Sequence, residues 1–238
     1  DGGLLMRGRD HARHIVTPRR VRRETLASFV RAWDTRGDRY IVQQGLNTKL
    51  ANGRVHDFRM LVQKNGEGEW EVTGCAGRIG PLKSITSNLH GGGKAASMNE
   101  LLRQGGFDSD QIRGIREKAN AFGIGVARHL ESTYDALCEL ALDLAIDRSG
   151  RVWLLEVNPK PAREVFIQAG ERDVYRKAIV RPLEYALWVY RQRRSSRSRS
   201  QTALREERSA AASRGADERA YAGDSADAVE AAIRNASG

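Results

Sequence analysis

Three oxygen-bearing side chains near the end of the apolar part of the chain are the strongest candidates for chemistry: Asp143, Glu156 and Asn158. Two carboxylates and one amide carbonyl are hard donors, which suit Mg²⁺ or Mn²⁺ better than zinc. Protein-bound Mg²⁺ commonly keeps phosphate oxygens of a substrate among its ligands. If the three side chains meet, they therefore predict a metal site that also holds a nucleotide.

A hairpin can bring the three donors together. Residues 147–150, Asp-Arg-Ser-Gly, have the composition of a type I turn, so we expect Ile146 to pair with Arg151. Counting back, Asp143 then lies opposite Leu154. Because side chains alternate along a strand, this register places all three oxygen donors on one face. An amphipathic hairpin whose acidic residues merely face solvent fits the same geometry, and spacing alone leaves both interpretations open.

Two arginines stand among apolar neighbours on predicted strands. Arg59 lies in a strand expected at 57–63, and Arg78 lies in one expected at 70–79 that returns beside it as a hairpin. A buried guanidinium is costly unless an anion meets it, and its planar fork suits phosphates and carboxylates. The two side chains therefore predict an anion site. A structural salt bridge, with Asp57 as the partner, is the alternative.

The glycine-rich segment 87–94 supplies a further set of groups. Asn88, His90 and Lys94 flank or interrupt a run that contains three consecutive glycines, whose backbone N–H groups can approach a ligand closely. Such a run is also typical of a flexible loop with an exposed histidine. It indicates a ligand site only in combination with the strands around it.

Helices and hairpins alternate around these residues. Ser97 and Glu100 predict a capping box for a short helix that ends at Gly105. Further helices are expected at 22–33, 110–121, 126–138 and 175–191, with Gly123 and Gly125 separating the middle two, and we expect a strand at 40–44 and a hairpin at 140–158. Mixed helices and antiparallel hairpins indicate an α+β or α/β domain.

Bulk composition narrows the class of protein. At 238 residues with 40% hydrophobic content the chain can bury a core, so it is not disordered as a whole. No apolar run approaches the roughly 20 residues of a membrane span. Cys75 and Cys138 stand alone in apolar segments, as buried thiols of a reducing compartment do. We therefore expect a soluble, cytoplasmic protein with no membrane partner. Its start at Asp1, within a glycine-containing turn, suggests a fragment of a longer parent.

The composition changes abruptly after residue 190. In residues 191–238 arginines alternate with serines, and then Ala, Glu, Arg and Asp dominate, so little apolar surface remains to offset the entropy of ordering. We expect a disordered or partly helical tail, separate from a domain at 1–190. The net charge of +10 and the Arg/Ser run permit weak nucleic-acid binding. A solvated tail is the simpler interpretation, because no aromatic residues are interleaved.

Several of these motifs, taken in order, resemble ATP-grasp proteins. They are Tyr40–Gly45, Asp57–Arg59, Arg78, Ser87–Gly92 and Glu156–Asn158. Within that superfamily the chain is most similar to the YheC/YheD type, described as spore-coat-associated, with a fainter similarity to RimK-type glutamate ligases. The resemblance covers about residues 1–190. It implies an α+β fold, the C-terminal catalytic portion of ATP-grasp, with antiparallel sheets flanked by helices and ATP in a cleft between subdomains.

The resemblance also implies roles for individual residues. Asp143, Glu156 and Asn158 would bind Mg²⁺ or Mn²⁺. Arg59 and Arg78 would meet the γ-phosphate of ATP or an acyl phosphate. The metal set is the one that the hairpin register also places on one face, so the two lines of inference agree on it.

The nucleotide and acceptor sites follow from the same resemblance. Asn88, with the glycines at 91–93, would border the acceptor, and the nucleotide would contact Gln43, Gln44, Gly45, Leu46 and Lys94. The implied function is that of an ATP-dependent carboxylate–amine (or thiol) ligase acting through an acyl phosphate, cytoplasmic or spore-associated. A non-catalytic nucleotide-binding or spore-coat assembly protein is the alternative, because the sequence starts at or after the family's phosphate-covering glycine loop and shows no counterpart to its lysine strand.

Overall fold

The computed structural model describes residues 3–9, 15–33, 44–82, 87, 89 and 92–236. The chain divides into two compact units, Asp1–Tyr185 and Ala186–Gly238, and each is described by itself. Sheets and the helices packed on them make up the first unit, so this unit holds the candidate site residues.

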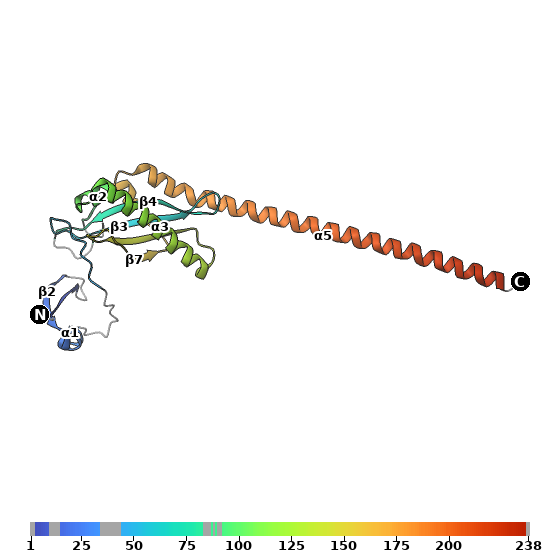
Figure 1. Cartoon of the computed structure of the whole chain (residues 1–238), viewed down its shortest axis with the longest axis horizontal. Helices are drawn as coiled ribbons and strands as arrows, with labels where there is room; N and C mark the ends of the chain where they lie inside the picture. Colours follow the sequence, from blue (N-terminus) through green and yellow to red (C-terminus); the bar gives the residue numbers. More distant parts are fainter. Residues whose placement is uncertain are drawn as a thin grey trace. The chain divides into compact units, whose positions relative to one another are not determined.

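An antiparallel five-stranded sheet lies at the centre of the first unit, in the order β5-β4-β3-β6-β7 (Figure 1). Its strands are β3 (His56–Lys64), β4 (Trp70–Ile79), β5 (Lys94–Ser97), β6 (Glu139–Ile146) and β7 (Val152–Asn158). Both predicted hairpins are confirmed, as β3–β4 and β6–β7. β3 and β6, which are distant in the sequence, pair in the middle of the sheet and join the two hairpins into one surface.

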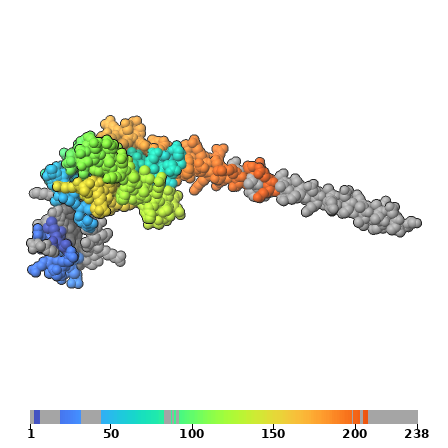
Figure 2. Space-filling model, in the orientation of Figure 1, coloured from blue at the N-terminus to red at the C-terminus, as the bar shows by residue number. Residues whose placement is uncertain are grey.

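Two helices, α2 (Met98–Gln104) and α3 (Ser109–Tyr134), pack on one face of this sheet. In the space-filling view they form much of the visible green surface (Figure 2). Phe58 and Met60 on β3 and Leu142 on β6 are fully buried in this main core. The predicted capping box of α2 is confirmed in part. The Glu100 N–H donates a hydrogen bond of 3.2 Å to Ser97 Oγ, whereas the Glu100 carboxylate accepts from Gln104 rather than from the N–H of Ser97.

The predicted division of the next helical region is wrong. α3 runs unbroken through Gly123 and Gly125 and ends at Tyr134. Gly123 is instead a point of close approach to the sheet, because a Cβ atom there would lie 2.5 Å from Met60 Sδ and 3.4 Å from Val62 Cγ2. Packing of the helix on the strands therefore requires the glycine and outweighs its low helix propensity.

The opposite face of the sheet contacts α4 (Glu164–Gln168) and the first turns of α5 (Arg172–Ala236). Leu61, Ala76 and Phe166 are buried in this second core. The fit is close at Gly74 of β4, where a Cβ atom would lie 2.2 Å from Val174 Cγ1. The helix predicted at 175–191 is thus confirmed as part of α5, whose helical backbone continues to Ala236.

The N-terminal part forms a separate ribbon. β1 (Gly3–Arg9) pairs with β2 (Ile15–Arg22), and the short helix η1 (Arg23–Thr25) leads into α1 (Leu26–Trp33), as predicted for 22–33. The predicted strand at 40–44 falls mostly outside the described residues, and Gln44 belongs to no strand. Within the described ranges, no helix has both the length and the apolar character needed to cross a membrane.

Candidate nucleotide site

Charged side chains from four strands share the face of the sheet that α2 and α3 leave uncovered. Asp57 lies opposite Arg78 in the β3–β4 pair. Arg59 lies opposite Asp143 in the β3–β6 pair, and Asp143 lies opposite Glu156 in the β6–β7 pair. Because directly paired residues point to the same face, the pairing of β3 with β6 assembles one row of charges from segments far apart in the sequence.

The turn of the β6–β7 hairpin differs from the predicted one by a residue. Ile146 pairs with Val152 rather than with Arg151. Gly150 has a φ of 79° and its N–H donates to the carbonyl of Asp147 at 2.9 Å. A residue in this left-handed conformation that follows a type I turn lengthens the loop by one residue. A prediction from turn composition alone does not include this extra residue.

A second irregularity lies beside the candidate metal residues. Asp143 pairs with Glu156 rather than with Leu154, because the register shifts between Asp143 and Leu144. A shift of one residue moves a side chain to the opposite face, and two such shifts restore it. The predicted pairing of Asp143 is therefore wrong, whereas Asp143 and Glu156 do share a face.

The arginines and the buried carboxylates form one network. Arg59 donates two hydrogen bonds to Asp143, from Nε at 2.7 Å and from Nη2 at 2.9 Å. Arg78 donates two to Asp57, at 2.7 and 2.6 Å, and its Nη2 also lies 2.9 Å from Asp143 Oδ2. Such bidentate pairs fix the planes of both groups. The network holds both guanidinium groups and the Asp143 carboxylate at the surface of the sheet.

The electrostatics of Arg78 follow from this network. Burial lowers the pKa of its guanidinium, but hydrogen bonds and charge from Asp57, with a further contribution from Asp143, raise the pKa above its ordinary value. Arg78 is thus always cationic. The salt bridge to Asp57 that the sequence left open as an alternative is present, and it coexists with the contact to Asp143.

A cavity of about 620 Å³ lies against this charged row. Four of the residues singled out by the sequence line it: Arg59, Arg78, Asp143 and Glu156. The rest of its wall consists of Leu89, Ala162, Glu164, Val165 and Gln168. Asp143 is only 5% exposed, whereas Glu156 is exposed and forms no hydrogen bond or ion pair with another described residue. Glu164 is likewise exposed and unpaired among the described residues, so the cavity combines two fixed cations with two carboxylates that are available to a ligand.

Asn158 has an unsatisfied amide. It lies on the same face as Glu156, two residues further along β7 and opposite Ala141. Its Nδ2 atom is buried and has no hydrogen-bond partner among the described residues. The two ends of an amide have the same shape, so a half-turn of the group places Oδ1 there instead. On the same face as Asp143 and Glu156, it offers a third hard oxygen donor of the kind that Mg²⁺ or Mn²⁺ prefers.

Four other predicted site residues do not line this cavity: Gln44, Gly45, Leu46 and Lys94. Gln44 and Gly45 are exposed and Leu46 is half-buried in an irregular segment, and Lys94 is exposed at the start of β5. Gln43 and Asn88 lie outside the described residues. The roles assigned to these six residues stay predictions.

Glu164 was missed by the sequence reasoning. It begins α4 and lines the cavity beside the charged row. Its approach to the strands depends on how the chain turns after Asn158. The prolines at Pro159 and Pro161 signal that β7 ends there, but they do not show that the following helix returns over the sheet.

Comparison with known proteins places this chain in a family. The model of a family described as "YheC/D like ATP-grasp" matches residues 3–189. The endospore coat-associated protein YheD of Bacillus subtilis (strain 168) is 27% identical over 191 residues, which cover 79% of this chain and 41% of that protein. The endospore coat-associated protein YheC of the same organism is 30% identical over 133 residues, 55% of this chain and 36% of that protein.

The chain spans less than half the length of each of these two relatives. The family match nevertheless covers most of the chain, and the antiparallel sheet with flanking helices confirms the predicted α+β class. ATP-grasp is an ATP-binding fold. This chain is a member of the YheC/D-like ATP-grasp family.

Proposed function

We propose that this chain binds Mg-ATP in the cavity beside Arg59, Arg78, Asp143 and Glu156, and that it supplies this site to an ATP-dependent carboxylate–amine (or thiol) ligase acting through an acyl phosphate. The cavity carries the proposal, because it unites cations and oxygen donors in a family whose fold binds ATP. Its volume of about 620 Å³ is of the size that small-molecule ligands occupy.

Glu156, Asp143 and Asn158 would hold the metal ion. A divalent cation between a carboxylate set and a triphosphate neutralises the charge on the phosphoryl group that is transferred. Glu156 is the first ligand to consider, since its carboxylate is exposed to the cavity and unpaired among the described side chains. Asp143 already accepts hydrogen bonds from Arg59 and forms an ion pair with Arg78, so its oxygen atoms are shared between guanidinium groups and any cation.

The arginines would bind the anionic end of the nucleotide. The bond to Asp143 holds Arg59 against the cavity, and its side chain is 15% exposed there. Arg78 is anchored by Asp57, so it keeps its place if Asp143 turns toward a cation. Two guanidinium groups on a rigid sheet orient a phosphoryl group and offset its charge, which is the contribution that positioned side chains make to phosphoryl transfer.

A second function is favoured by a specific observation. In the structure Asp143 is fully engaged by Arg59 and Arg78, and both curated relatives carry names of endospore coat-associated proteins. The alternative is therefore a protein that binds nucleotide without turnover and serves assembly of the spore coat. ADP release that depends on an added acceptor would support the ligase. Nucleotide binding without ADP release across a broad panel of carboxylates, amines and thiols would favour the alternative.

Calorimetry on the 238-residue chain tests nucleotide binding itself. We expect Mg-ATP to bind, and Glu156→Gln to weaken the binding at least tenfold because an anionic ligand is replaced by a neutral near-isostere. Glu117→Gln, an exposed substitution on α3, is the matched control and should leave the affinity unchanged. Equal affinity in wild type and Glu156→Gln, or no binding of Mg-ATP at all, would contradict the proposed site.

A further inference from the structure

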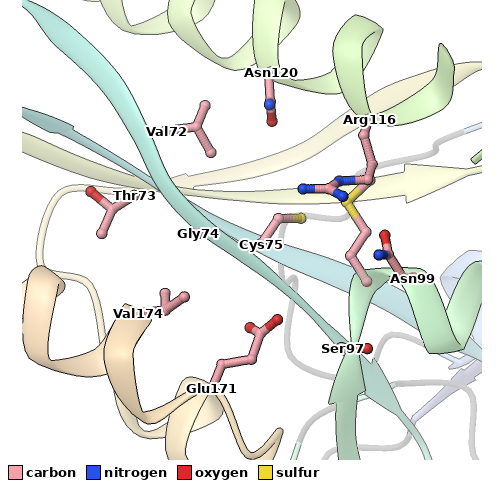
Figure 3. A pocket seen from close by; sticks show the side chains of 11 residues that line it. Val72, Thr73, Gly74, Cys75, Ser97, Asn99, Arg116, Asn120, Glu171 and Val174 are labelled. Atoms are coloured by element: carbon pink, nitrogen blue, oxygen red, sulfur yellow. The ribbon is translucent and has the colours of Figure 1, made fainter. Parts of the chain in front are cut away.

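A second cavity, of about 210 Å³, opens beside the first half of β4. It shares no lining residue with the nucleotide cavity. β5 pairs with β4 only from Ala76 to Ile79, so the β4 residues 72–75 have no strand partner on that side within the described part of the chain. These four residues form the floor of the cavity (Figure 3). Alternate residues of an antiparallel strand direct their backbone N–H and C=O groups to opposite sides, so the groups of every second residue here face away from β3 and toward this open side.

Side chains of opposite charge face this floor from two sides. Arg116 projects from α3, and Glu171 projects from the turn before α5; in Figure 3 both point toward Cys75. Neither forms a hydrogen bond or ion pair with another described residue, although the charge of Arg116 acts on Glu171. The cavity thus has a cationic side and an anionic side that do not bridge each other.

The cavity also holds unsatisfied acceptors. Glu171 Oε2 and Asn99 Oδ1 are buried and have no hydrogen-bond partner among the described residues. Burial raises the pKa of Glu171, and Arg116 partly offsets this effect. Buried acceptors without donors are rare in folded proteins and call for a partner. Each of the two atoms therefore calls for a hydrogen-bond donor in the cavity.

The size of the cavity and its other lining residues restrict which ligand can bind there. A cavity of 210 Å³ is below the roughly 300–1,000 Å³ of sites for drug-sized ligands, so the ligand is smaller. Asn120 on α3 adds an amide on the side of Arg116. Burial raises the pKa of the Cys75 thiol, so this side chain is a neutral wall and not a nucleophile.

We propose that this edge cavity binds a free α-amino acid as a zwitterion. The carboxylate of the ligand would meet Arg116, with Asn120 beside it. The ammonium group would donate to Glu171 and Asn99. A single amino acid offers the same N–H and C=O spacing as a residue of an added strand, so it also suits the open edge of β4. The site is independent of ATP binding and of the proposed ligase reaction.

Titration of the full chain with each of the common L-amino acids, without nucleotide, tests this proposal. Calorimetry at pH 8 and low salt should detect at least one binder with a dissociation constant in the millimolar range or below. N-acetylation and α-amidation of that amino acid should each weaken binding at least tenfold, because each removes one charge of the zwitterion. If no amino acid binds, or if the blocked derivatives bind as well as the free form, the proposal is wrong.

Variants separate this site from an unspecific surface. Glu171→Gln and Arg116→Gln should each reduce affinity at least tenfold. The exposed neighbours Glu117→Gln and Lys118→Gln, on the same helix as Arg116, should not. Circular dichroism and the thermal midpoint show whether each variant folds. Because all four variants lie outside the nucleotide cavity, Mg-ATP affinity should stay at the wild-type value. Unchanged amino-acid affinity in folded Glu171→Gln protein would overturn the proposal whatever the outcome for ATP.

Discussion

Asp143 is held more firmly than Glu156, although both carboxylates line the proposed nucleotide cavity. Two guanidinium groups form ion pairs with Asp143, which is 5% exposed, whereas Glu156 is exposed and unpaired among the described residues. Substitution at the two positions therefore has different consequences. A change at Asp143 acts on the fold as well as on any ligand, and a change at Glu156 acts on the ligand alone.

We expect Asp143→Asn to lower the free energy of unfolding by about 3 kcal/mol, because it leaves Arg59 without its carboxylate partner in a buried network. Glu156→Gln should change it by less than about 0.5 kcal/mol, as exposed substitutions usually do. Urea denaturation of both variants measures the difference. Equal stability of the two would show that the arginine network contributes nothing to folding.

Gly123 and Gly125 both lie in α3, but only Gly123 packs closely against the sheet, so we expect substitution by alanine to have opposite effects on stability at the two positions. Gly123→Ala should destabilise the protein by about 1–3 kcal/mol, because its Cβ atom would press on the buried Met60. Gly125→Ala meets nothing within 4 Å, so it should stabilise by up to about 1 kcal/mol through helix propensity. Urea midpoints of the pair test this. Stabilisation by both substitutions would show that the helix can move away from the sheet at no cost.

The β6–β7 turn gives a dependence of stability on pH. Hydrogen bonds from the hydroxyl of Ser149 and the indole of Trp153, together with backbone N–H groups, lower the pKa of Asp147 from 3.8 to about 2. The folded state therefore binds fewer protons than the unfolded state between these values, and the stabilisation is present above pH 3.8 and lost as the pH falls toward 2. We expect Asp147→Ala to be less stable than wild type at pH 5, with a difference that narrows between pH 4 and 2. Urea denaturation across this range measures the difference, and a constant difference would mean that the charge of Asp147 is not involved.

Four of the five strands of the central sheet could be predicted from the sequence, but β5 and the register could not. Alternating apolar residues and turn composition are local signals, and they located β3, β4, β6 and β7 correctly. The extra residue at Gly150 and the irregularity beside Asp143 depend on how the finished hairpin twists and packs. The supposed helix break at Gly123 failed for the same reason, since the partner that requires a glycine is Met60, far away in the sequence.

For the molecule as a whole, the components of the proposed nucleotide site could be predicted from the sequence more fully than their surroundings. Residue type and strand position were enough to select four candidate site residues, Arg59, Arg78, Asp143 and Glu156. Pairing of β3 with β6 brings these residues together. Glu164 and the edge cavity could not be chosen, because they depend on where α4 and the start of α5 cross the sheet. Such long-range placement has no local signal in a single sequence.

The division of the chain into two units predicts that Mg-ATP binding and any RNA binding depend on different parts of the sequence. All residues that line either cavity belong to Asp1–Tyr185, and the Arg/Ser run at 193–199 belongs to Ala186–Gly238. A chain that ends at Arg191 should therefore keep wild-type Mg-ATP affinity in calorimetry. It should also lose any binding of single-stranded RNA that weakens with salt, as contacts between arginine and phosphate do. A filter-binding titration at two salt concentrations measures the second effect. Loss of Mg-ATP binding in the shortened chain, or RNA binding that persists in it, would mean that the region after Arg191 is not the separate basic tail that the composition indicates.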